Sequence, residues 1–296
     1  MLDTEGIDAW DQTGQYSVQI FSLAVLLSSL FVYNQMGGID EAAVDRLSLV
    51  TEMTKHIRVR AGASKGAPWP SISMEFKNIY YSLESCAPAG QSSESELAQF
   101  TPSFLWLLRD FYLELVEDGR SVSPKEYLET ALSSTPETSA SAKAKNGIRE
   151  SIKSLFPDRD CFPLVRPISD EAKLARLESV PPAQLRPEFR EGLSKLTAMC
   201  FAKAQPKHVG RTIITGPMLA GLVSAYVDAI NGGAVPNIAT AWQGVAEAEC
   251  RRAADAAEQE YHRVINHDVA ADPESLLAEH QRALDAAKAI FDRVCP

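Results

Sequence analysis

Leu2-Asp3-Thr4-Glu5-Gly6-Ile7 is the stretch on which the interpretation of this chain depends. It places an apolar residue ahead of an Asp-x-x-Gly pattern. A buried strand with this ending can deliver an aspartate that reaches Mg²⁺ through water and a glycine amide that faces a terminal phosphate. Short clusters of aspartate and glycine are also common in ordinary turns, so the stretch alone leaves both interpretations open.

A second apolar run, Phe104-Leu105-Trp106-Leu107-Leu108, ends in Arg109-Asp110. We expect a buried strand that carries the Asp110 carboxylate to the C-terminal edge of an open α/β sheet, where such sheets bind ligands. A carboxylate at that edge can accept hydrogen bonds from both the ring N–H and the exocyclic amine of guanine. Adenine lacks this donor pattern, so the pairing would discriminate between the two bases.

Patterns typical of helices and strands alternate through most of the chain. In order, we expect a helix over 20–29, a strand over 30–34, a helix over 40–58 with Asp40 as its N-cap, a strand over 104–108, helices over 124–132 and 142–156, a strand over 161–165 and a helix over 188–203. This alternation favours an α/β fold with a partial, doubly wound and mostly parallel sheet.

The last part of the chain has a different character. Helices rich in Ala, Glu and Arg are expected over 218–230, 237–265 and 273–294, which indicates an α-helical bundle. We therefore divide the chain into a sheet-containing domain over 1–212 and a helical domain over 213–296. Within the first, residues 61–99 break the pattern with clusters of Gly, Ser, Ala and Pro, and we interpret them as a variable, exposed insertion.

The composition of the chain argues against several kinds of binding partner and site. The 296 residues carry a formal net charge of -10, which argues against nucleic acid or an anionic membrane surface as a general partner. The five cysteines form no CxxC pair, so neither a zinc site nor a disulfide framework is indicated. No basic segment followed by an apolar core opens the chain, and we expect a cytoplasmic protein. The longest apolar stretch, 20–33, is shorter than the roughly twenty residues of a membrane span.

These stretches and others in a fixed order resemble the guanylate-binding proteins, large GTPases of the dynamin superfamily related to atlastins. The resemblance covers most of the chain and is closest to the plant-type branch. It is carried by Leu2-Asp3-Thr4-Glu5-Gly6, residues 20–29, Tyr33-Asn34-Gln35, Val50-Thr51-Glu52, Trp106-Leu107-Leu108-Arg109-Asp110-Phe111, Pro124-Lys125-Glu126-Tyr127-Leu128, Cys161-Phe162, Arg166-Pro167, Arg186-Pro187-Glu188-Phe189, Gly216-Pro217 and Tyr226-Val227-Asp228-Ala229-Ile230.

The resemblance implies a GTPase G domain followed by the start of a helical middle domain, with GTP as substrate and Mg²⁺ as cofactor. The residues it assigns are Asp3, Glu5 and Gly6 for catalysis, with Asp3 holding Mg²⁺ through water and Gly6 facing the γ-phosphate, and Arg109, Asp110 and Arg166 for nucleotide binding. An alternative role for Arg166, in place of nucleotide binding, is an ion pair with a nearby carboxylate.

In the family, the segment after Arg166-Pro167 caps the guanine base and forms a surface through which two G domains dimerise. The resemblance therefore implies a homodimer through the G domain. Here that segment begins Ile168-Ser169-Asp170-Glu171, which departs from the basic residues of the vertebrate members. Nothing in these residues indicates a membrane target.

No Gly-x-x-x-x-Gly-Lys-Ser/Thr stretch occurs in the sequence. That phosphate loop supplies the backbone N–H groups and the lysine that hold the β- and γ-phosphates. We therefore expect a chain that represents part of a longer GTPase, lacks the first strands of its G domain, and hydrolyses GTP inefficiently. The alternative is a non-catalytic interaction or scaffold protein derived from such a GTPase. An unrelated helical scaffold would require both the Asp3 and the Asp110 stretches to be accidental.

Overall fold

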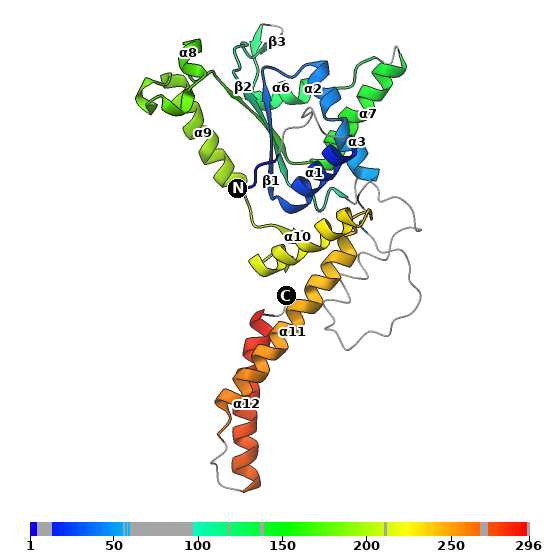
Figure 1. The fold of residues 1–296 in the computed structure, drawn as a ribbon, viewed down its shortest axis with the longest axis vertical. Coiled ribbons are helices and arrows are strands. Elements are labelled where there is room, and N and C mark those ends of the chain that lie inside the picture. Colours follow the sequence, from blue (N-terminus) through cyan, green and yellow to red (C-terminus); the bar gives the residue numbers. More distant parts are fainter. Residues whose placement is uncertain are drawn as a thin grey trace.

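The computed structural model of the chain describes residues 1–4, 14–55, 57, 59, 97–117, 119–136, 139–209, 212–266 and 272–294. Two of the assigned catalytic residues, Glu5 and Gly6, lie outside the described residues, as does most of the 61–99 insertion. Figure 1 shows a sheet flanked by helices, from which a long pair of helices projects.

The sheet has three parallel strands in the order β1-β2-β5. They are β1 (Leu30–Met36), β2 (Ser103–Arg109) and β5 (Arg159–Leu164). Met36 pairs with Arg109 and Arg109 pairs with Leu164, so all three strands end at the same edge. The expected α/β fold with a parallel sheet and a helical C-terminal region is confirmed.

One face of the sheet packs against most of the helices. These are α1 (Gly14–Leu27), α2 (Glu41–Arg46), α3 (Ser48–Lys55), α6 (Pro124–Ala131) and α7 (Ala140–Leu155). Successive side chains of a strand point to opposite faces. Accordingly, Phe104, Trp106 and Leu108 of β2 enter the main core with Phe21 of α1 and Ile152 of α7.

The opposite face packs against α9 (Pro187–Lys203), which lies on the other side of the sheet in Figure 1. The alternate β2 residue Leu105 forms a second cluster there with Leu164 of β5 and Leu196 of α9. The sheet therefore lies between two helical layers, as expected for a parallel sheet whose central strand β2 is a nearly continuous apolar run.

Four local differences from the sequence expectations are visible. At the N-terminus, residues 1–4 form no strand and Leu2 is 76% exposed, so the interpretation of this stretch as the end of a buried strand is wrong. Helix α1 begins at Gly14 rather than at residue 20. The helix expected over 40–58 is divided into α2 and α3, because Leu47 leaves the helical conformation and buries its side chain completely. A short hairpin of β3 (Val116–Glu117) and β4 (Arg120–Ser121) follows β2, where we expected no strand. The N-cap at Asp40 is confirmed, since its side chain accepts a hydrogen bond from the Ala43 amide.

Smaller elements connect β5 to the helical region. They are α8 (Glu171–Leu174), η1 (Leu177–Ser179), η2 (Pro182–Gln184), and the paired strands β6 (His208–Val209) and β7 (Thr212–Ile213). The helical region itself contains α10 (Gly216–Asn231), α11 (Ile238–Val264) and α12 (Pro273–Val294). In Figure 1, α11 and α12 run side by side away from the sheet.

The helical region shares its core with the sheet. Tyr226 of α10 and Trp242 of α11 belong to the same buried cluster as Phe21 and Val25 of α1. A polar contact reinforces this junction: the Nζ of Lys207 donates 2.9 Å hydrogen bonds to the carbonyls of Ser28 and Phe100. Burial lowers the pKa of Lys207 to about 8. The two parts of the chain are therefore joined by buried side chains as well as by the backbone.

Candidate functional site

The carboxyl edge of the sheet brings together the residues that follow β2 and β5. Asp110 comes directly after β2, and Arg166 lies two residues beyond the end of β5. Backbone hydrogen bonds join the loops at this edge, with Gly37 N–H donating to Arg109 C=O at 2.8 Å and Phe111 N–H donating to Leu164 C=O at 3.0 Å. This is the edge at which open α/β sheets bind ligands.

Asp110 has an unusual backbone conformation. Its φ is 54°, and it is the one non-glycine residue with positive φ among the described part of the chain. An L-residue in this left-handed region costs about 1 kcal/mol, less for Asp and Asn than for most others. Such strained residues gather at ligand sites, where the surrounding structure holds them. The Asp110 side chain is half-buried, at the position where we expected a base-recognising carboxylate.

Arg166 forms an ion pair at the same edge. Its Nη2 donates a 2.9 Å hydrogen bond to Oε2 of Glu171, while its buried Nε has no partner among the described residues. Asp170 caps α8 by accepting from the amides of Ala172 and Lys173. The alternative of a carboxylate partner for Arg166 is therefore observed, and this ion pair uses one of the five N–H donors of the guanidinium. Arg109 is exposed beside Asp110.

The turn between β1 and α2 forms a wall beside Asp110. The Nε1 of Trp106 donates to Oε1 of Gln35 at 3.1 Å, and Nε2 of Gln35 donates to the Gly38 carbonyl at 2.6 Å. The next amide, that of Ile39, donates to the hydroxyl of Tyr127 at 2.9 Å. These bonds hold the turn against β2 and α6.

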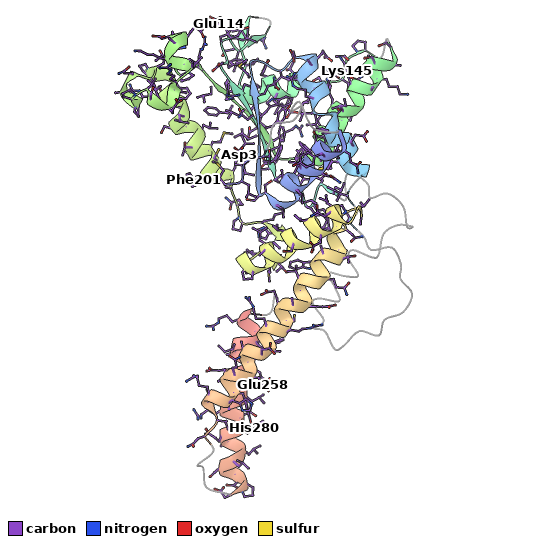
Figure 2. All side chains as sticks on the ribbon, in the orientation of Figure 1. Asp3, Glu114, Lys145, Phe201, Glu258 and His280 are labelled. Carbon is purple, nitrogen blue, oxygen red and sulfur yellow. The ribbon has the colours of Figure 1, made fainter. Side chains whose placement is uncertain are left out.

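Asp3 lies elsewhere, on a cleft of about 460 Å³ beside β1 and α1. The same cleft is lined by Thr4, Asn34 and Arg46 (Figure 2 labels Asp3). Asp3 is exposed, and one of its carboxylate oxygens accepts a hydrogen bond from the Thr4 amide at 3.1 Å. No hydrogen bond or ion pair among the described residues joins Asp3 to Asp110 or Arg166.

The donor set at Asp3 agrees with a magnesium ion held in part by a substrate. Proteins commonly bind Mg²⁺ through one or two carboxylates, with waters and substrate phosphates completing the octahedron. The exposed Asp3 carboxylate fits that mode of binding. Within the described ranges, no group of three or more His, Cys, Asp or Glu side chains could hold a metal by itself.

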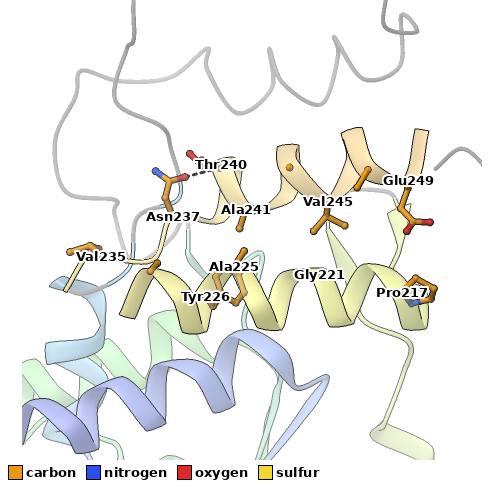
Figure 3. Close-up of a pocket in the computed structure, with 13 residues that line it drawn as sticks. Pro217, Gly221, Ala225, Tyr226, Val235, Asn237, Thr240, Ala241, Val245 and Glu249 are labelled. Carbon is orange, nitrogen blue, oxygen red and sulfur yellow. Dashed lines mark hydrogen bonds between the residues drawn. The ribbon is translucent and has the colours of Figure 1, made fainter. Parts of the chain in front are cut away.

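A second hollow lies in the helical region. It is a groove of about 450 Å³ between α10 and α11, lined by small side chains such as Ala225 and Ala241, with Asn237 at one end and Glu249 at the other (Figure 3). Gly221 and Val245 meet at its floor, where a Cβ on Gly221 would lie 2.8 Å from Cγ2 of Val245. The groove contains none of the residues that the sequence assigns to nucleotide binding or catalysis.

Sequence patterns did not indicate the residues that support this edge. We interpreted Gly37-Gly38 only as the end of a strand, and Tyr127 only as part of a block of resemblance. The available signal was the double glycine, since a glycine after a strand often marks a close approach of side chains. At Gly38 an added Cβ would lie 3.0 Å from the Tyr127 hydroxyl.

Comparisons with known proteins agree with the expected family. Residues 1–209 match the family model described as "Guanylate-binding protein, N-terminal domain", and residues 210–294 match "Guanylate-binding protein, C-terminal domain". Guanylate-binding protein 6 of Mus musculus is 34% identical over 296 residues, which cover 98% of this chain and 45% of that protein.

Other relatives give the same result. Guanylate-binding protein 1 of Mus musculus is 35% identical over 93% of this chain and 43% of its own length. Guanylate-binding protein 6 of Homo sapiens is 36% identical over 86% of this chain and 38% of its own length. The chain therefore spans less than half the length of these relatives. None of the described helices combines the length and the apolar character needed to cross a membrane.

Proposed function

The chain belongs to the guanylate-binding protein family, and from this premise we propose that it recognises the guanine base of GTP as part of a large GTPase. The observation that carries the proposal is the half-buried Asp110, held with a φ of 54° at the carboxyl edge of the central strand. Its carboxylate would accept from the ring N–H and the exocyclic amine of guanine.

Two arginines support the same proposal. Arg109 is exposed beside Asp110, and Arg166 presents a buried, unpartnered Nε from the loop after β5. We assign both to nucleotide binding. Arg166 would keep its ion pair with Glu171, which orients the guanidinium, and would offer other N–H donors of the guanidinium to the nucleotide.

The catalytic assignments concern the phosphate end of the nucleotide. We propose that Asp3 holds Mg²⁺ through water, and that Glu5 and Gly6 of the same stretch serve catalysis, with the Gly6 amide toward the γ-phosphate. Bound Mg²⁺ would neutralise charge that develops on the phosphates. We propose that Asp3 and Asp110 act on opposite ends of one nucleotide, Asp3 at the phosphates and Asp110 at the base.

The wider organisation follows from the same premise. We propose that residues 1–212 form the C-terminal part of a G domain, with a variable insertion at 61–99, and that residues 213–296 begin a helical middle domain. We further propose a cytoplasmic protein that dimerises through the G domain and does not bind nucleic acid, which agrees with its net charge of -10.

A non-catalytic interaction protein derived from such a GTPase is the second candidate. It is favoured by the lack of a Gly-x-x-x-x-Gly-Lys-Ser/Thr motif in these 296 residues, which leads us to expect inefficient hydrolysis by this chain itself. Phosphate release from GTP can contradict only the second candidate, because slow hydrolysis by this chain is expected under both. A turnover rate typical of GTPases would contradict the non-catalytic alternative.

The test of base recognition is the substitution Asp110→Asn, measured by calorimetric titration with GTP and with XTP in the presence of Mg²⁺. Asparagine offers one acceptor and one donor, which match the ring N–H and the C2 carbonyl of xanthine. We expect the preference to shift from guanine to xanthine by about tenfold or more. Asparagine also tolerates the left-handed backbone, so the fold should be retained.

The matched control is Asp285→Asn, the same chemical change at an exposed site on α12. It should leave the affinity for both nucleotides unchanged. A wild-type chain that binds no guanine nucleotide would contradict the proposed function. So would an Asp110→Asn chain with an unaltered preference.

A further inference from the structure

The left-handed conformation of Asp110 requires support from its neighbours. Residues in strained backbone regions persist only when surrounding contacts hold them. The residue before Asp110 is tied to β1, because the Arg109 carbonyl accepts from the Gly37 amide at 2.8 Å. The residue after it is tied to β5, because the Phe111 amide donates to the Leu164 carbonyl at 3.0 Å.

The Phe111 side chain supplies a third attachment. It is 6% exposed, and its ring packs edge-to-face on the ring of Tyr127, with centroids 6.0 Å apart and an interplanar angle of 68°. Edge-to-face pairs of this kind are stabilising beyond the area they bury. The direction in which the chain leaves Asp110 therefore depends on where α6 places Tyr127.

Tyr127 also holds the β1–α2 turn, whose Gly37 amide is bonded to the residue before Asp110. Its hydroxyl accepts the hydrogen bond from the Ile39 amide at 2.9 Å. Gly38 approaches so closely that an added Cβ would lie 3.0 Å from this hydroxyl and 3.2 Å from Cδ1 of Leu113. One side chain thus contacts both segments that bracket the carboxylate, the β1–α2 turn and the start of the loop after β2.

The helix that carries Tyr127 is itself well anchored. Ser123 and Glu126 form a reciprocal capping box at the start of α6, with the Ser123 hydroxyl accepting from the Glu126 amide at 3.2 Å. Capping boxes satisfy backbone donors that a helix end would otherwise leave unpaired. Tyr127 lies in the first turn after this cap, so its position is set by α6 rather than by the loops it contacts.

We propose that Tyr127 is a positioning residue for base recognition, which fixes the orientation of the Asp110 carboxylate through Phe111 and through the β1–α2 turn. The inference rests on the proposed function of Asp110 as the acceptor for guanine. The role proposed for Tyr127 requires no contact between this side chain and the base. It acts by limiting the directions in which the carboxylate can point.

The test is Tyr127→Phe in the 296-residue chain, with GTP and ITP affinities measured by calorimetric titration in the presence of Mg²⁺. Inosine lacks the exocyclic amine of guanine, so the ratio of the two affinities reports the contact between that amine and the carboxylate. We expect GTP affinity to fall about tenfold in Tyr127→Phe, ITP affinity to fall less, and the ratio to decrease. Hydrogen exchange at the Ile39 amide should become faster, because that amide loses its acceptor.

The matched control is Tyr261→Phe in the helical hairpin, which also removes one hydroxyl that makes a 2.9 Å hydrogen bond, there to Nδ1 of His280. It should leave the ratio of GTP to ITP affinity unchanged. A general loss of folded chain would lower both affinities equally and would not change the ratio.

The outcomes distinguish failure of the proposed function from failure of the inference about Tyr127. A wild-type chain that does not bind GTP, or does not prefer it to ITP, would overturn the proposed function together with the inference. Tyr127→Leu also removes the ring that packs on Phe111. A wild-type chain that prefers GTP, combined with Tyr127→Phe and Tyr127→Leu chains that both keep the same preference, would overturn the inference alone.

Discussion

Replacing Gly221 by alanine should destabilise the contact between α10 and α11. Gly221 lies in α10 opposite Val245 of α11 (Figure 3), and an added Cβ would stand 2.8 Å from Cγ2 of that valine, where ordinary contacts begin near 3.4 Å. Rotating the valine offers little relief, because β-branched residues in helices strongly prefer one rotamer. One of the two side chains or helices must therefore move.

Two opposing effects set the magnitude. Overpacking a tight contact costs roughly 1–3 kcal/mol. Alanine in place of a helical glycine gains about 1 kcal/mol. We expect Gly221→Ala to lower the free energy of unfolding by about 1 kcal/mol, with the overpacking term the larger of the two.

Urea denaturation followed by circular dichroism would measure the change. Gly244→Ala is the control, because Gly244 is also helical but has nothing within 4 Å of an added Cβ. Gly244→Ala should raise the free energy of unfolding by about 1 kcal/mol. In a Val245→Ala background the obstructing methyl groups are absent, so Gly221→Ala should become stabilising by a similar amount. A Gly221→Ala change that stabilises the wild-type chain as much as Gly244→Ala does would refute the reasoning.

Two further predictions concern buried cations. Burial lowers the pKa of Lys207 to about 8, from 10.5 in the unfolded chain, so the folded state loses this proton first as the pH rises. The free energy of unfolding should therefore increase by up to about 3 kcal/mol between pH 8 and 10.5. The urea midpoint of unfolding should rise across that pH range in the wild-type chain but not in Lys207→Met. An equal rise of the midpoint with pH in both chains would contradict the lowered pKa of Lys207. Arg149 is almost fully buried and pairs with Glu41. It also donates hydrogen bonds to the Ala131 carbonyl and to Oδ1 of Asn146, so Arg149→Ala, which removes both bonds and leaves a cavity, should lower the free energy of unfolding by about 3 kcal/mol. Lys145→Ala, which removes a more exposed partner of the same Glu41, should cost at most about 1 kcal/mol in the same assay.

Several features could be predicted from local sequence patterns. The apolar run before Arg109-Asp110 predicted a buried strand, and the alternation of helix and strand predicted a parallel sheet. The N-cap at Asp40 was predicted from a short polar side chain ahead of a helical pattern, and its hydrogen bond to the Ala43 amide is observed. These predictions succeeded because each depends on residues that are neighbours along the chain.

Other features depended on packing between distant parts of the chain. The 40–58 helix is divided at Leu47, which leaves the helical conformation while its side chain is fully buried, and helical spacing alone does not reveal such a break. The predicted boundary near residue 212 gave no sign that α10 and α11 share a core with α1. Both outcomes arise because the apolar surface that each helix buries is supplied by another element.

The candidate site shows the same division between local and tertiary causes. The sequence by itself placed Asp110 at the end of a buried strand and indicated the family, since both follow from the order of residue types along the chain. The left-handed backbone of Asp110 and its support by Tyr127 were decided only by tertiary structure. Ile39 and Tyr127 lie 88 positions apart, and the fold brings them together by packing α6 against the end of β1. No local pattern encodes a hydrogen bond whose two groups belong to different elements of the fold.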